Sequence, residues 1–369
     1  MATNKNQHFV PRCYLRPFTI NGANAAINLY NIDRQQFIPL APVKNQCSRD
    51  YFYGHDEKLE RAIQSIEGEY GTALREILRS GYVLTDAHRT TLRLFWLFQH
   101  LRTEAAAKRA IEMVDSMREA TGLTGSTFRL VIKEAVVMAM HTFAEAMHII
   151  DDLRICLIRN RTPIPFITSD DPAVLTNKWW LTDNRTLGHS FGLHSAGAII
   201  LLPLSPKLLC LGYDGDVYSV PHDRGMVDVR REGDIAIFNQ HQIVNCRANL
   251  FVQNAEHYRV VHEAFSEAAR NRPRTHHIVT YAVRDRTEGE YTRYRVVDPG
   301  VREKHTEAII HTRVIHPVPL SWPGQITRRS MGAVFTNGTG LGYVRYAATA
   351  RPTQSPFHKE SAYRTVRRR

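Results

Sequence analysis

The segment Leu92-Arg93-Leu94-Phe95-Trp96-Leu97-Phe98 is apolar on nearly every side of the helix that it would form. Thr85 and Asp86 precede it as capping residues, and we expect the helix to continue to about Met117. A helix that is apolar almost all round is normally buried. The sequence therefore predicts that this helix lies at the centre of the core.

Three more helices are expected around this one. The first begins after Asp56 and carries apolar residues at helical spacing, namely Leu59, Ile63, Ile66, Tyr70, Leu74 and Ile77. Another is expected from Thr124–Ser126 to about Leu153, and a last one over about Asp234–Ala264.

Strand-like runs are grouped separately from the helices. In the first 265 residues they are Ala26–Asn31, Gln36–Pro39, Ile155–Ile158, Ile164–Thr168, Ala196–Leu202 and Leu208–Tyr213. Segregation of helices and strands favours an α+β fold over a doubly wound sheet. We expect a helical N-terminal core packed on a mostly antiparallel sheet.

Positive charge is concentrated at the end of the chain. The 369 residues have a formal net charge of +12, and residues 271–369 hold 18 Lys and Arg against 7 Asp and Glu, a net of +11. We therefore predict an α+β domain over 1–265, a linker over 266–274, a small β-rich basic unit over 275–350 and a basic tail over 351–369. The unit's strand-like runs are His277–Arg284, Tyr291–Val297, Ala308–Ile315 and Gly342–Ala348.

Several function classes lack their signatures. The chain has no GxxxxGK[ST], GxGxxG after a strand, HExxH or GxSxG motif, and its five cysteines form no CxxC pair. No signal peptide is apparent, and apolar runs such as Ala196–Leu204 are far shorter than the about 20 residues of a membrane span. We expect a cytoplasmic protein with no membrane partner, and the oligomeric state stays open.

The N-terminal segment Gln7–Phe18 is the first candidate site. It places His8, Arg12 and Arg16 within nine residues, between prolines. His8 is a candidate general acid or base, and the arginines are candidate phosphate ligands. The alternative is an arm that docks on the core and whose arginines pair with buried acids.

A second candidate is the turn Ser169-Asp170-Asp171-Pro172, which follows a hydrophobic run. Asp170 and Asp171 could bind a divalent metal such as Mg²⁺ or orient His8, although the ligands of a metal are not fixed by the sequence. The alternative is turn chemistry, in which the carboxylates accept the backbone N–H groups of the residues that follow and Asp171-Pro172 starts a turn or helix. A catalytic Asp170 would tolerate Asp170→Asn without unfolding, whereas a structural one would not.

Two weaker candidates lie on the first two helices. Arg93 and His100 loosely resemble the pair of HEPN-type ribonucleases, but Arg102 as a polar pocket residue is the favoured interpretation. Glu60 and Glu67 are seven residues apart and share a helical face. They are candidate catalytic acids, but the favoured interpretation is that this face of the helix is exposed to solvent.

The opening Gln7–Phe18 resembles that of the bacterial family called domain of unknown function 4238, which reads roughly Gln-His-aromatic-Val-Pro-x-x-Tyr-Leu-Arg-x-Phe. Further matching segments are Phe52-Tyr53-Gly54 with Glu67, Gln99–Thr103, Ser169–Pro172, Pro203–Pro206, and Asn239 with Asn245. The likeness covers about residues 6–260 and implies no activity. It directs attention to the polar residues inside the motifs: His8, Arg12, Arg16, Arg102, Asp170, Asp171 and Asn239.

Two functions from different classes are consistent with these residues. One is a phosphodiester-cleaving, nuclease-like enzyme of the kind found in bacterial defence or toxin modules. It would use His8 for proton transfer and Asp170 and Asp171 for a metal or for orientation. The other is a non-catalytic protein that grips nucleic acid through its basic C-terminal unit. For the enzyme, we expect His8 and Arg12 to approach the Ser169–Pro172 turn.

Overall fold

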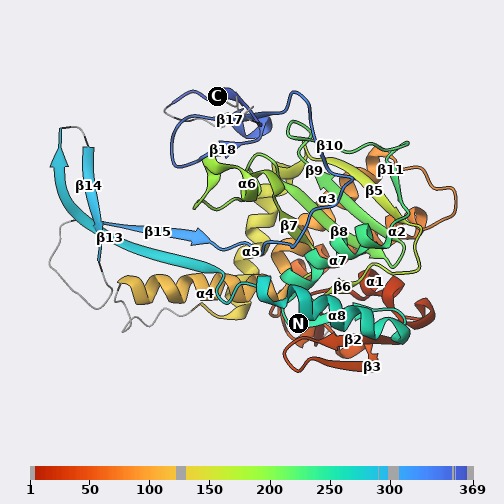
Figure 1. The fold of residues 1–369 in the computed structure, drawn as a ribbon. Coiled ribbons are helices and arrows are strands. Elements are labelled where there is room, and N and C mark those ends of the chain that lie inside the picture. The colour runs from red at the N-terminus through yellow and green to blue at the C-terminus, as the bar shows by residue number, and fades with distance from the viewer. Residues whose placement is uncertain are drawn as a thin grey trace.

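The computed structural model describes residues 5–121, 130–289, 291–297, 307–350, 353 and 355–363. Its helices and sheets confirm the α+β class (Figure 1). Among the described strands every pair is antiparallel except β5 with β11. None of the described helices is both long and apolar enough to cross a membrane.

The helical layer contains α2 (Glu57–Ile77), α3 (Asp86–Arg102), α4 (Glu104–Thr121) and α5 (Ile132–Ala146). Asp56 and Thr85 cap α2 and α3 as predicted. The predicted single helix from Asp86 to Met117 is wrong, because Thr103 is extended and its hydroxyl accepts the N–H of Ala106 at the start of α4. The expected start of the next helix, at 124–126, lies outside the described residues.

Helix α3 lies at the centre of the core, as predicted. Phe95, Trp96, Leu97 and Phe98 are buried, and the ring of Phe95 stacks on that of Tyr70 with 3.5 Å between centroids. The indole N–H of Trp96 donates to a carbonyl of the main sheet, that of Leu201, at 3.1 Å. The helix is thus joined to the sheet by packing and by a buried hydrogen bond.

The main sheet has the order β11-β5-β9-β8-β7. Its strands are β5 (Arg154–Asn160), β7 (Val174–Thr176), β8 (Ile199–Ser205), β9 (Leu208–Tyr213) and β11 (Met226–Val229). Every residue of β8 and β9 is buried. Ile200 and Leu202 pack in the core that contains α3, whereas Ile199 and Leu201 pack in a second core on the opposite face.

A second sheet has the order β3-β2-β12-β6, from β2 (Ala26–Asn31), β3 (Gln36–Pro42), β6 (Thr168–Ser169) and β12 (Asn249–Val252). The predicted helix over Asp234–Ala264 is wrong. It is divided into α7 (Glu232–Asn245) and α8 (Tyr258–Ala268), with β12 between them. The reason is tertiary: the run Leu250-Phe251-Val252 is buried by pairing with β2.

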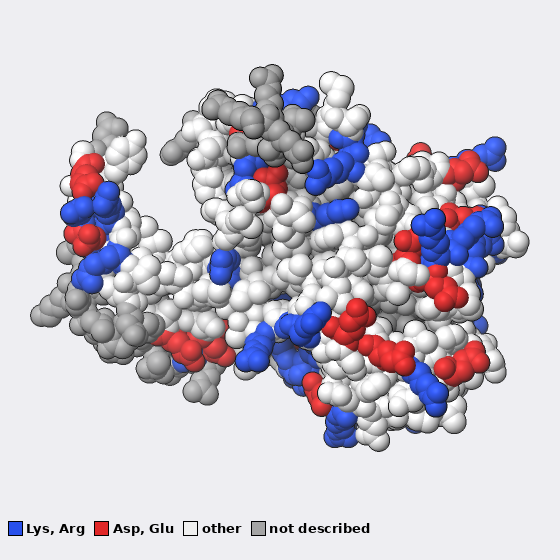
Figure 2. Space-filling model, in the orientation of Figure 1, with Lys and Arg blue, Asp and Glu red and all other residues white. Residues whose placement is uncertain are grey.

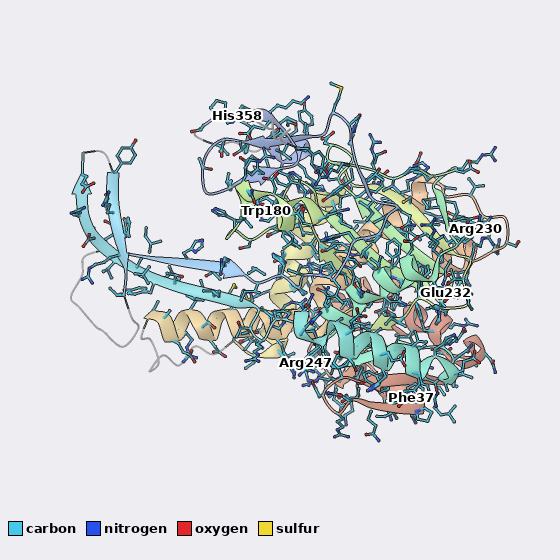
Figure 3. All side chains as sticks on the ribbon, in the orientation of Figure 1. Phe37, Trp180, Arg230, Glu232, Arg247 and His358 are labelled. Atoms are coloured by element: carbon cyan, nitrogen blue, oxygen red, sulfur yellow. The ribbon has the colours of Figure 1, made fainter. Side chains whose placement is uncertain are left out.

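The C-terminal strands form two small sheets. One contains β13 (His277–Glu288), β14 (Tyr291–Val296) and β15 (Ala308–Val314), and in Figure 1 it extends away from the body alongside α4. The other contains β17 (Ala333–Thr336), β18 (Tyr343–Val344) and β19 (His358–Ser361), and it covers α6 (Lys178–Thr182), where Trp180 lies below His358 in Figure 3. The predicted strand Gly342–Ala348 is wrong beyond Val344, because Tyr346–Ala350 turn as a 3-10 helix. The proposed division into domains at 265 stays a prediction.

The remaining elements are short. They are β1 (Asn6–His8), α1 (Arg12–Leu15), β4 (Ser48–Asp50), β10 (Tyr218–Ser219) and β16 (Thr327–Arg328). Strand β1 pairs with β4, and α1 is joined to β6 by a 2.7 Å hydrogen bond between the hydroxyls of Tyr14 and Thr168. The N-terminal segment therefore docks on the body of the protein.

Asp170 connects the end of β6 to the segment between α7 and β12. Its carboxylate oxygens accept the backbone N–H groups of Arg247 and Ala248 at 2.8 Å and of Asn249 at 3.0 Å. Burial raises the pKa of this carboxyl group to about 6, and the three N–H groups oppose that rise. Asp170 thus binds backbone N–H groups, but they lie 77–79 residues away and are not those of the next residues, as turn chemistry would have it.

We expect Asp170→Asn to destabilise the fold. The amide NH₂ that replaces one oxygen cannot accept a hydrogen bond, so at least one buried N–H loses its partner. The free energy of unfolding should fall by about 1–3 kcal/mol for each such N–H. Urea unfolding measures the change, with Asp33→Asn at an exposed position as control. Equal stability of Asp170→Asn and wild type would contradict this role.

Candidate functional site: a central cavity and an N-terminal pocket

The polar residues singled out in the sequence are distributed between two hollows. The N-terminal pocket, of about 350 Å³, is lined by β1, α1 and α2 and includes His8, Arg12 and Glu67. The central cavity, of about 370 Å³, is lined by α3, α4, the Asp171 turn, the end of α7 and the bases of β13 and β15. Asp171 lines the central cavity, so the structure does not bring it to His8.

The buried side chain of Arg102 lies beside the N-terminal pocket and contacts several of the segments around it. Its guanidinium pairs with Glu67 at 2.8 Å, donates to the carbonyl of His8 at 2.5 Å and lies over the ring of Phe98. Arg102 is fully buried, and it joins three of the motifs that are far apart in the sequence. The pairing expected of Arg12 and Arg16 with buried acids is not found among the described residues; the arginine that pairs with an acid here is Arg102.

His8 lies half-buried on the wall of the N-terminal pocket. Burial lowers the pKa of its imidazole, and the positive charges of Arg12 and Arg102 lower it further. Its Nε2 is buried and has no hydrogen-bond partner in the described part of the chain. The ring is therefore neutral at pH 7 and retains an unused nitrogen.

Three other predicted residues hold the chain in place. Arg12 donates to the carbonyl of Asn24 at 3.1 Å, and Arg16 donates to that of Gly22 at 3.2 Å. Asn239 on α7 accepts the N–H of Ile167 and donates to the carbonyl of Pro165. The two exposed arginines thereby fasten one loop, while the buried Asn239 fastens the segment that leads into β6.

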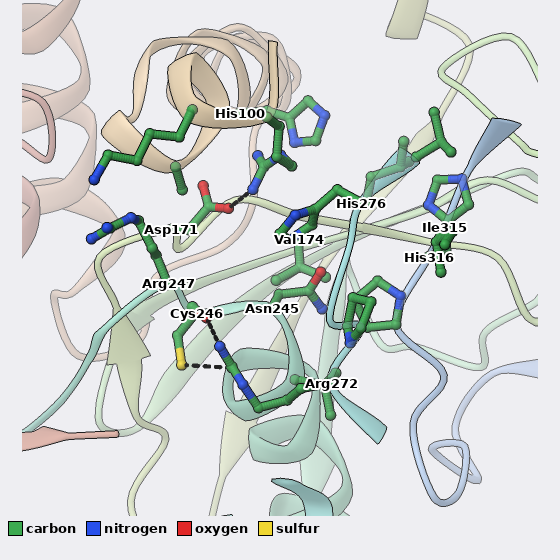
Figure 4. A pocket seen from close by; sticks show the side chains of 18 of the residues that line it. His100, Asp171, Val174, Asn245, Cys246, Arg247, Arg272, His276, Ile315 and His316 are labelled. Carbon is green, nitrogen blue, oxygen red and sulfur yellow. Dashed lines mark hydrogen bonds and ion pairs between the residues drawn. The ribbon is translucent and has the colours of Figure 1, made fainter. Parts of the chain in front are cut away.

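Asp171 belongs to the central cavity (Figure 4). One of its oxygens accepts the hydroxyl of Thr103 at 2.7 Å, and the other accepts the guanidinium of Arg109 at 2.5 Å. Asp171 thus fixes Arg109 on the first half of α4, with this arginine lining the cavity. The break between α3 and α4 at Thr103 is what allows both contacts.

His100 lines the same cavity and has one unprotonated ring nitrogen. Its Nδ1 lies 3.0 Å from the carbonyl of Ala173, so Nδ1 carries the proton and Nε2 is left with a lone pair. The ring stacks on Trp96, with an angle of 13° between the planes. Burial lowers the pKa of His100, although the Ala173 carbonyl opposes this. The imidazole is therefore oriented and neutral.

Cations outnumber carboxylates around the central cavity. Lys108, Arg109, Arg247 and Arg272 line it, against Asp171 and Glu112. Lys108 pairs with Glu104, and Arg272 donates to the carbonyls of Ile243 and Cys246 at the end of α7. The guanidinium of exposed Arg247 makes no hydrogen bond or ion pair with the described residues, and Figure 3 shows it at the surface.

Sequence reasoning missed Arg109, Arg247, His276 and His316 as cavity residues. His276 pairs with Glu112 at 2.9 Å, and His316 follows β15. No local spacing connects these residues, since they come from four different elements. Within the described ranges no three or more His, Cys, Asp or Glu side chains are arranged to hold a metal ion.

The fold and its site define an α+β protein with a cation-lined central cavity. Residues 6–256 match a family described as protein of unknown function DUF4238, which is more than half of the chain. The chain therefore belongs to this family, and the resemblance seen in the sequence is confirmed. Comparisons with curated proteins and with solved structures found no match. The matched region contains His100 and Asp171 but ends before His276 and His316.

The loss of stability on breaking the Arg102–Glu67 pair should depend on which partner is removed. Glu67→Ala leaves the fully buried guanidinium of Arg102 without its carboxylate, and we expect the free energy of unfolding to fall by about 3–5 kcal/mol. Arg102→Met should cost less, because Glu67 is partly exposed and can be hydrated. Urea unfolding compares them, with exposed Glu69→Ala as control. A larger loss for Arg102→Met would contradict this account.

Proposed function

We propose that this protein is a phosphodiester-cleaving, nuclease-like enzyme whose active site is the central cavity. The observation that carries the proposal is the neutral, oriented His100, which keeps a lone pair on Nε2 and lines a cavity that four cations also line. A general base and positively charged phosphate ligands are what hydrolysis of a phosphodiester requires. His100 here takes the role that the sequence suggested for His8.

In the proposed site Arg109 and Arg247 have different roles in binding a phosphate. Arg109 is held by Asp171, so its position is fixed before a ligand arrives. Arg247 makes no contact that a phosphate would have to break, so it is free to form a bidentate pair with two phosphate oxygens. Its backbone is in turn fixed by Asp170. One cation is therefore preorganised and the other is available.

The chemical step follows from the lone pair on His100. A water oxygen forms a bond to phosphorus while its proton moves to Nε2. The bond from phosphorus to the leaving ribose oxygen breaks, and that oxygen takes a proton from solvent. Arg109 and Arg247 stabilise the charge that develops on the phosphate oxygens.

The alternative is binding of nucleic acid, without catalysis, through the basic C-terminal unit. On the projecting sheet four of the five arginines lie close to carboxylates: Arg284 with Glu307, Arg286 and Arg293 with Glu288, and Arg295 with Asp285. Figure 2 shows the two charges interleaved along this projection. Phosphates would have to compete with these carboxylates, as they would with Asp171 at Arg109. At Arg247 no carboxylate of the described residues competes, so this residue favours the cavity over the sheet.

Replacing the proposed base should abolish most of the activity. We expect His100→Gln to lower turnover by about 10²–10⁴-fold, because glutamine can still donate to Ala173 but cannot take up a proton. Cleavage of labelled single-stranded RNA and DNA is measured with Mg²⁺, with Mn²⁺ and with a chelator. His8→Gln is the matched control and should retain activity.

Two outcomes would contradict this assignment. Loss of activity in His8→Gln but not in His100→Gln would move the active site to the N-terminal pocket. Absence of cleavage by the wild-type protein under every condition would favour non-catalytic binding. Thermal unfolding of each variant separates a loss of fold from a loss of chemistry.

The pH dependence should follow the base form of His100. Burial, with a further contribution from Arg109, holds its pKa below the usual value of 6.5, while Ala173 and Asp171 oppose this. We therefore expect kcat/KM to be constant between about pH 7 and 8 and to fall as the pH drops through the pKa of His100. Burial lowers the pKa of His316, in the same cavity, to about 4. A rate that increases on acidification below pH 6 would show that a protonated histidine is required.

A further inference from the structure

The wall of the central cavity opposite Arg247 is apolar and aromatic. Figure 4 shows Arg247 on one side of the cavity and Ile315 and His316 on the other, with Val174 between them. Apolar residues of the lining include Val174, Leu175, Val314 and Ile315. A cavity with a cationic end and an apolar end suits a ligand that carries a phosphate on a hydrophobic body.

His316 gives the apolar end a flat surface. One face of its ring stacks on Phe191, with 3.5 Å between centroids and 13° between planes, and the residue also lines the cavity. Burial lowers the pKa of His316 to about 4, so the ring is uncharged at pH 7. A neutral ring backed by a second ring can continue a stack with a third aromatic ring.

His316 also has an unused hydrogen-bonding atom. Its Nε2 is buried and has no partner among the residues that the structure describes. A buried nitrogen without a partner is destabilising, and a ligand N–H would relieve that penalty. Nucleobases present both an aromatic face and N–H groups at their edge.

We propose that the apolar end of the central cavity binds one unstacked nucleobase against His316 while Arg109 and Arg247 hold the attached phosphate. The ligand class is a nucleotide unit of a single strand. The placement of the phosphate rests on the proposed function. The base subsite has its own evidence in the ring of His316, which stacks on Phe191, and in its Nε2, which has no partner among the described residues. At about 370 Å³ the cavity is near the lower limit of small-molecule sites, which is far too small for a double helix.

This arrangement gives the enzyme a preference for single strands. A base must leave the duplex stack to enter the cavity, and that costs free energy unless the strand is already unpaired. Stacking on an aromatic side chain tolerates different bases because every base has a π face. We therefore infer little sequence preference and a strong preference for single-stranded over double-stranded substrate.

The test is ligand binding to the full chain by calorimetry. The probes are adenosine 5′-monophosphate, ribose 5-phosphate and inorganic phosphate. We expect the nucleotide to bind at least about 10-fold more tightly than ribose 5-phosphate, since base stacking is worth roughly that factor or more. His316→Ala should remove this advantage while ribose 5-phosphate binds as before, and His316→Phe should keep most of it.

Control variants separate the two ends of the cavity. Arg247→Ala should weaken all three probes by a similar factor, and His311→Ala, at an exposed position on β15, should weaken none. If His316→Ala fails to fold, the base subsite is still tested by the ranking of the three probes on the wild-type protein and on the His316→Phe variant.

The outcomes distinguish this inference from the proposed function. Equal affinity for the nucleotide and ribose 5-phosphate would overturn the base subsite and leave the proposed catalysis intact. Tight nucleotide binding that depends on His316, without cleavage of RNA or DNA, would support the subsite and overturn catalysis. Cleavage of duplex and single-stranded substrates at equal rates would also overturn the subsite.

Discussion

The fold around the central cavity depends on the buried carboxylate of Asp170. By accepting three consecutive backbone N–H groups, it fixes the segment that leaves α7 at the end of β6. Arg272 fixes the same segment, because its guanidinium donates hydrogen bonds to the carbonyls of Ile243 and Cys246 at the end of α7. The cost of burying charged groups is offset here by hydrogen bonds to the backbone. Asp171 follows Asp170 in the chain, and Arg247 supplies one of the three N–H groups. The contacts of Asp170 therefore also position these two residues of the cavity.

The sequence predicted the elements whose signals are local. Strands Ala26–Asn31 and Leu208–Tyr213 and the caps Asp56 and Thr85 are found as expected, because alternation and capping depend on neighbouring residues. The breaks at Thr103 and after Asn245 could not be predicted in the same way. Thr103 is held by Asp171, 68 residues away, and Asn249–Val252 by a strand near the N-terminus. Helical periodicity continues through both places, and tertiary contacts interrupt it.

The candidate site was only partly visible in the sequence for the same reason. His100 and Asp171 lie in motifs that were singled out, but their neighbours Arg247 and His316 come from segments with no signal of their own. Adjacent residues also have opposite fates: Asp170 turns inward to the backbone and Asp171 turns to the cavity. Arg102 has a structural role, since its contacts with Glu67 and His8 join three motifs. A motif therefore identifies residues that matter without stating whether they hold the fold or the ligand.

Net charge is a poor guide to the binding surface of this chain, although it first suggested an anionic partner. On the projecting sheet, Arg284, Arg286 and Arg293 each lie within 4 Å of a carboxylate, which lowers the local potential that a phosphate would meet. Arg247 differs because Asp170 binds its backbone N–H, whereas its guanidinium makes no hydrogen bond or ion pair with the described residues. A phosphate at Arg247 displaces solvent alone, whereas one at the sheet must displace a carboxylate. The proposed site in the cavity therefore rests on Arg247 rather than on the more numerous, paired arginines of the sheet.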